Sequence, residues 1–102
     1  MARATILIRE KAIAENGDIL EVVVWRLTAT PRSVSGVRYR LAFVRHAERV
    51  PAVLYDNHSP KGHHRHIEGT EEPYNFIDVD QLMEDFMRDV RQARGGDRWP
   101  RR

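Results

Sequence analysis

The dipeptide Asn16-Gly17 constrains the fold more than any other feature, because it separates two runs of strand-like residues. Both residues tolerate positive φ, so the pair favours a type I′ turn between antiparallel strands. In the run before it, residues 4–9, Ile6 and Ile8 share one side, and this period of two is typical of a β-strand. We therefore expect the chain to begin with a β-hairpin.

Further strands are expected after this turn. Residues 18–28 (DILEVVVWRLT) are apolar on both faces, which is typical of a central strand. Residues 37–46 (VRYRLAFVRH) alternate between apolar and mostly polar side chains. A fourth strand is expected around residues 50–56, and residues 74–77 could add a fifth.

A helix is expected from Asp78 onward. Asp78 is a favourable N-cap, Gln81 is its capping-box partner, and Gly95 can end the helix. The helix carries one apolar stripe, formed by Val79, Leu82, Met83, Phe86, Met87 and Val90.

These elements predict an α+β fold, in which an antiparallel sheet of four or five strands packs one face against a C-terminal helix. Arg38 and Arg40 should then lie on the opposite, open face of the sheet. We expect a single domain over residues 1–95, followed by a flexible basic tail over residues 96–102.

Composition excludes several classes of protein. The chain has no cysteine, so disulfides and thiolate metal sites are excluded. Its N-terminal apolar run, residues 6–8, is too short for a signal-peptide core or a membrane span. We expect a cytoplasmic protein that does not associate with a membrane.

Charge is unevenly distributed along the chain. Residues 26–49 carry six arginines and one acid, residues 67–87 carry seven acids and no lysine or arginine, and residues 88–102 carry six arginines and two acids. Such segregation favours an anionic ligand on one surface and a different partner on another, although a solvated surface of mixed charge would show the same pattern.

The segment KGHHRHIEG, residues 61–69, places three of the five histidines within four positions. If the segment is extended, His64 and His66 project to one side about 7 Å apart, while His63 and Arg65 face away. Two such imidazoles could flank a phosphodiester and transfer protons at RNA, with Lys61 stabilising the extra negative charge.

The same spacing leaves two other interpretations open. The pair His64 and His66 also suits a divalent metal, with His58, Asp56 or Glu68 as a third ligand. Alternatively, the segment is an exposed polar loop without a chemical role.

A resemblance to a known family adds to these observations. The run Lys61-Gly62-His63-His64-Arg65-His66-Ile67, followed by Glu71-Glu72-Pro73-Tyr74 and the helix LMEDFMRDV, resembles the TumE family of toxin components of toxin–antitoxin systems. The family pattern K-G-x-H-x-H is met here by Lys61, Gly62, His64 and His66. The resemblance implies a small toxin, an RNase or another inhibitor of translation, with an antitoxin partner that is often a DNA-binding protein.

The leading hypothesis is a toxin of a type II pair that cleaves RNA by acid/base catalysis without a metal or another cofactor. The catalytic residues would be His64 and His66 as the proton-transfer pair and Lys61 as the electrostatic stabiliser. The expected substrate-binding residues are Arg38, Arg40, Gly62, His63, Arg65 and Tyr74.

Two other functions remain open. The protein could be a non-catalytic module whose arginines bind RNA or the ribosome, or a metalloenzyme built on His64, His66 and a carboxylate. The acidic stretch from Glu68 to Asp85 could dock the antitoxin, or could simply cap and solvate the helix. The protein could also form a homodimer.

Overall fold

The computed structural model describes residues 4–27, 36–58, 62–96 and 99. These residues form one antiparallel sheet of six strands and one helix, with the strands side by side in chain order. The elements are β1 (Ala4–Ile13), β2 (Ile19–Leu27), β3 (Val37–Val44), β4 (Val53–Asp56), β5 (His64–Ile67), β6 (Thr70–Pro73) and α1 (Val79–Ala93).

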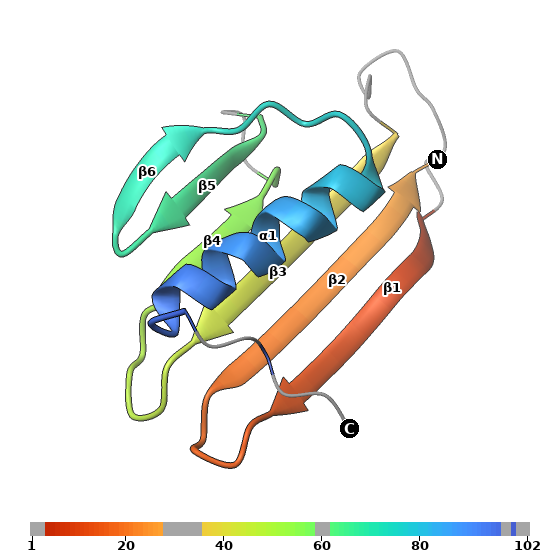
Figure 1. Ribbon diagram of the computed structural model, residues 1–102. Helices are drawn as coiled ribbons and strands as arrows, with labels where there is room; N and C mark the ends of the chain where they lie inside the picture. Colours follow the sequence, from red (N-terminus) through yellow and green to blue (C-terminus); the bar gives the residue numbers. More distant parts are fainter. Residues whose placement is uncertain (1–3, 28–35, 59–61, 97–98, 100–102) are drawn as a thin grey trace.

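Helix α1 lies along one face of the sheet, over β3 and β4 (Figure 1). Its predicted apolar stripe faces the sheet: Leu82, Phe86 and Val90 are fully buried, and the other three members pack around them. The core from the strands consists of alternate residues of β2, β3 and β4, namely Leu20, Val22, Val24, Tyr39, Leu41, Phe43, Val53 and Tyr55. The α+β class and the packing of the helix are confirmed.

The predicted number of strands was too low, because the histidine segment is part of the sheet. Residues 64–67 pair with β4, and residues 70–73 pair back on them as a second hairpin. The expected strand over residues 74–77 does not form, and these residues connect β6 to α1 without regular structure. A polar edge hairpin lacks the apolar alternation that identifies strands from sequence.

The first hairpin forms, but its turn differs from the prediction. The N–H of Gly17 donates to the carbonyl of Ala14 at 2.9 Å, and only Gly17 of the Asn16-Gly17 pair has a positive φ, of 93°. A type I′ turn requires positive φ at both central residues, and that condition is met at Glu68 (48°) and Gly69 (86°) between β5 and β6. The side chain of Asn16 instead accepts a bond from the N–H of Asp18 at 3.0 Å.

Both ends of α1 have recognisable caps. At the start, Asp78 accepts a hydrogen bond from the N–H of Gln81 at 2.7 Å. The Gln81 side chain donates to Asp85 at 2.8 Å, so the expected reciprocal capping box is replaced by a one-sided cap. At the end, the N–H groups of Gly95 and Gly96 donate to Gln92 and Arg91, which is a Schellman motif.

Most of the expected basic tail, residues 96–102, lies outside the described residues. Within it, Trp99 packs edge-on against Phe43 at 6.3 Å, and the guanidinium of Arg94 lies 5.4 Å from the ring of Trp99.

Among the described residues, no helix is long and apolar enough to cross a membrane.

Gly17 tests the first turn. A Cβ at this position would lie 2.2 Å from Nδ1 of His46, and the backbone φ is also unfavourable for alanine. We expect Gly17→Ala to lower the free energy of unfolding by about 2 kcal/mol, measured by urea denaturation.

Gly69 provides the matched control, since its φ is 86° but nothing lies within 4 Å of its added Cβ. Gly69→Ala should cost only about 1 kcal/mol. In a His46→Ala background the cost of Gly17→Ala should fall to the Gly69 value. Equal costs for Gly17→Ala with and without the His46 ring would contradict this explanation.

Candidate functional site

The face of the sheet opposite α1, here called the open face, is not covered by any other described element (Figure 1). Residues paired across neighbouring strands point to the same face. Arg40 pairs with Asp56, and Asp56 pairs with His64. Strands are about 4.8 Å apart, so the Cα atoms of Arg40 and His64 are about 10 Å apart on this face.

The β1–β3 part of the open face is cationic. A cavity of about 400 Å³ there is lined by Arg9, Glu10, Lys11, Glu21, Val23, Trp25, Arg40 and His58. Arg40 pairs with Glu21 at 3.3 Å, and both side chains are 41% exposed. Arg38 is two residues before Arg40 on β3 and is also exposed on the open face. Both arginines therefore have the orientation expected from the sequence.

His64 is the buried member of the histidine pair, at 7% exposure. Its Nδ1 lies 2.9 Å from the carbonyl oxygen of Gly62, and its Nε2 lies 2.8 Å from Oδ1 of Asp56. Each ring nitrogen therefore faces an acceptor, the carbonyl of Gly62 or the carboxylate of Asp56. These two contacts hold the ring in place.

His66 is the accessible member of the pair. Its side chain is 30% exposed, and its Nε2 lies 3.3 Å from Oε1 of Glu71, which is 38% exposed. The rings of His64 and His66 are 5.3 Å apart, as expected for two side chains on one side of an extended segment. A small cavity of about 150 Å³ borders the site, lined by His63, His64, Glu71, Glu72 and Pro73.

His63 faces away from this pair. Its ring stacks on Phe76 at 4.8 Å, and its Nδ1 lies 2.8 Å from the hydroxyl of Tyr39. Burial, with a smaller contribution from the charge of His64, lowers the pKa of His63 below its usual value. The structure thus places His63 in an aromatic cluster.

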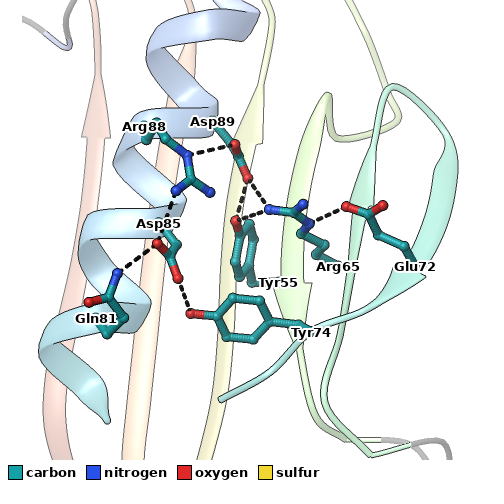
Figure 2. Close-up of polar contacts among 8 residues, drawn as sticks. All are labelled: Tyr55, Arg65, Glu72, Tyr74, Gln81, Asp85, Arg88 and Asp89. Atoms are coloured by element: carbon teal, nitrogen blue, oxygen red, sulfur yellow. Dashed lines mark hydrogen bonds and ion pairs between the residues drawn. The ribbon is translucent and has the colours of Figure 1, made fainter. Parts of the chain in front are cut away.

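Arg65 also lies on the helix side, in a network shown in Figure 2. Its guanidinium donates to Glu72, to Asp89 at 3.0 Å and to the hydroxyl of Tyr55 at 3.1 Å. Tyr55 itself donates to the buried carboxylate of Asp89, and these interactions join β4, β5, β6 and α1. Arg65 lies on the helix side because it is one residue out of phase with His64 and His66, and its expected phosphate contact stays a prediction.

Tyr74 belongs to the same side (Figure 2). Its hydroxyl donates to Asp85 at 2.6 Å, and its ring packs edge-on against Tyr55 at 4.9 Å. Burial, followed by the bond to Asp85, raises the pKa of Tyr74. Tyr74 therefore lies on the helix side of the sheet, and its expected role in substrate binding stays a prediction.

The remaining predicted site residues are only partly placed. Lys61 lies outside the described residues. Gly62 has a φ of 77° and nothing within 4 Å of an added Cβ. Of the carboxylates considered as a third metal ligand, Glu68 pairs with Arg45 at 2.6 Å and Asp56 pairs with His64.

The carboxylate that approaches His66, Glu71, was not predicted as a site residue. Its position follows from the turn at 68–69, which makes His66 and Glu71 cross-strand partners. The spacing H-x-E-G-x-E predicts that His66 and Glu71 pair across the strands once a two-residue turn is assumed at Glu68-Gly69. The proposed acidic docking surface is also partly engaged, since Glu71, Glu72 and Asp85 all have partners within the chain.

The structure thus defines a small α+β protein whose antiparallel sheet carries cations, two histidines and a carboxylate on its uncovered face. The family model of toxin TumE matches residues 3–94. The chain therefore belongs to the TumE toxin family, and its role is that of a toxin. No curated protein and no solved structure matches the chain at a significant level.

The lowered pKa of His63 predicts a pH dependence of stability. Because the unfolded chain takes up this proton more readily than the folded one, the free energy of unfolding should fall as pH drops below about 6.5. His63→Phe, which preserves the ring stack, should show a smaller fall between about pH 7 and 5. The measurement is urea denaturation at several pH values.

The exposed His46 supplies the control for this experiment. His46→Gln should keep the pH dependence of the parent. If His63→Phe also kept the pH dependence of the parent, burial of a neutral His63 would not be the cause of that dependence.

The network around Asp89 predicts a large loss of stability. Asp89 is 8% exposed and accepts from both Arg65 and Tyr55, so Asp89→Asn removes the charge that compensates a half-buried guanidinium. We expect the free energy of unfolding to fall by about 3 kcal/mol. The exposed Glu84 on the same helix is the control, and Glu84→Gln should change it by less than about 0.5 kcal/mol. Similar small effects for both variants would contradict the structural role.

Proposed function

We propose that this toxin binds RNA on the open face and cleaves it at His66 and Glu71. The observation that carries the proposal is the placement of a cationic strand region and a histidine–carboxylate pair on the same uncovered face. Cationic side chains bind phosphates without regard to sequence, and an imidazole beside a carboxylate can transfer protons.

The cationic strands would hold the RNA backbone. Arg38 and Arg40 lie on β3, two strands away from the histidines on β5. Arg40 is 41% exposed, and its pairing with Glu21 at 3.3 Å is the kind of surface contact that a phosphate can displace. A strand of RNA crossing β3, β4 and β5 would bring one phosphate to these arginines and a neighbouring phosphate to His66.

The chemistry requires one base and one acid. The Glu71 carboxylate would accept the proton of a ribose 2′-hydroxyl, whose oxygen then attacks the adjacent phosphorus. Protonated His66 would donate a proton to the departing 5′-oxygen, leaving a 2′,3′-cyclic phosphate. The attacking and leaving oxygens lie on opposite sides of phosphorus, so binding has to separate the two side chains from their 3.3 Å contact.

His64 would act as a positioning residue. Its exposure of 7% and its contacts with Gly62 and Asp56 do not suit direct contact with RNA. Its ring lies 5.3 Å from that of His66 and can orient it. We therefore assign the proton transfer expected of His64 to Glu71. Cleavage would need no metal.

An antitoxin is the expected protein partner of a toxin from a type II pair. It could restrain the toxin by covering the open face, since that face carries the groups proposed for RNA. The acidic stretch from Glu68 to Asp85 has less support as a docking surface, because Glu71, Glu72 and Asp85 bind groups of this chain.

The test is cleavage of a labelled RNA of about 30 nucleotides by purified protein, with growth arrest on induced expression as a second readout. We expect His66→Ala and Glu71→Gln each to slow cleavage by about 100-fold or more and to relieve the growth arrest. His46→Ala, which removes an exposed imidazole from the loop after β3, should cleave like the parent. Unchanged cleavage by His66→Ala would overturn the assignment.

A second function, binding RNA without cleaving it, is favoured by the cationic strands alone. In that case Arg40→Ala should weaken RNA binding and reduce its salt dependence, while His66→Ala should have no effect on growth arrest. Arg91→Ala is the matched control, because it also removes one positive charge but from the exposed surface of the helix. Growth arrest by the parent without new RNA fragments would favour this function.

A further inference from the structure

We infer that His64, His66 and Glu71 form a site for a divalent transition-metal ion such as Zn²⁺, and that metal binding blocks the proposed cleavage. One ligand atom from each residue lies within 4.8 Å of the other two. Ligands of a tetrahedral zinc ion are about 3.4 Å apart, so small side-chain rotations bring the three onto one ion. The inhibition rests on the proposed function, whereas the metal site does not.

The chemistry of the ligands selects the kind of metal. Two imidazoles with one carboxylate suit Zn²⁺ and its neighbours in the transition series, whereas Mg²⁺ and Ca²⁺ prefer oxygen ligands. Three protein ligands leave at least one position for water. The partial exposure of His66 and Glu71 gives an ion direct access from solvent.

The surroundings of His64 support the site independently of the cluster itself. The carbonyl of Gly62 lies 2.9 Å from Nδ1, so a proton on that nitrogen is held there, and an ion that binds Nε2 would replace its contact with Asp56 at 2.8 Å. Such a carbonyl contact is a common way to orient a ligating histidine. It also requires the turn at Gly62, whose φ is 77°.

Asp56 provides the second supporting observation. Its Oδ1 is buried, lies 2.8 Å from Nε2 of His64, and has no other hydrogen-bond partner among the described residues. A carboxylate at this position adds negative charge next to the ion and can serve as a further ligand. Asp56 is on β4 and His64 on β5, so the pairing of these strands holds the two groups together.

Metal binding would affect function because the ion and the proposed cleavage use the same atoms. A metal ion that binds Nε2 of His66 and a carboxylate oxygen of Glu71 uses the groups proposed to donate and accept protons. Metal binding and catalysis would then be mutually exclusive, and a rise in free zinc would silence the toxin. This differs from a metalloenzyme, in which the ion would increase the rate.

The first experiment is calorimetric titration of ZnCl₂ into untagged, chelator-treated protein. We expect one ion per chain, and at least 10-fold weaker binding by His66→Ala and by Glu71→Gln. Both residues are on the surface of an edge hairpin, and circular dichroism will confirm that the variants fold. His46→Ala, which removes an imidazole elsewhere, should bind like the parent. No binding, or equal binding by all variants, would overturn the site.

The second experiment measures RNA cleavage by the parent with saturating zinc and again after chelation. Loss of cleavage with zinc and recovery with chelator is the expected result. Unchanged or faster cleavage with zinc would overturn the inhibition. One-to-one binding that depends on His66 and Glu71, with no cleavage under any condition, would support the metal site and contradict the proposed RNase activity.

Discussion

The pairing of β5 with β4 determines how the histidine segment is used. Side chains alternate between the faces of a strand, so this register directs His64 and His66 to the open face and Arg65 to the helix. The contact of Arg65 with Asp89 links that register to α1, because a shift by one residue would bury imidazoles against the helix and expose the guanidinium. The network in Figure 2 therefore supports the site from the opposite face of the sheet.

Much of the fold follows from local sequence rules. The apolar stripe of α1 and the alternation in β3 each predict their buried face, and the H-x-H spacing correctly predicts that His64 and His66 share a side. The β5–β6 hairpin was missed because it is short, polar and stabilised by pairing with β4. Its turn is type I′, whereas the Asn-Gly sequence that suggested such a turn adopts a different one.

Only part of the candidate site could be predicted from the sequence. Arg38 and Arg40 were correctly placed on the open face from alternation alone, although their contact with RNA remains a prediction. The roles of Arg65 and Tyr74 could not be read from sequence, because their partners Asp89 and Asp85 come from a helix some distance along the chain. Glu71 required knowledge of the second hairpin, and Lys61 lies outside the described residues.

One measurement addresses the central claim that RNA meets the protein at His66 on the open face. The ring resonances of the histidines would be followed by nuclear magnetic resonance while a 2′-O-methyl RNA, which cannot be cleaved through its 2′-oxygen, is added. The resonances of His66 and its neighbour His64 should shift with saturation, while those of His63, enclosed by Tyr39 and Phe76, should stay in place. Shifts at His63 without shifts at His66 would contradict this claim.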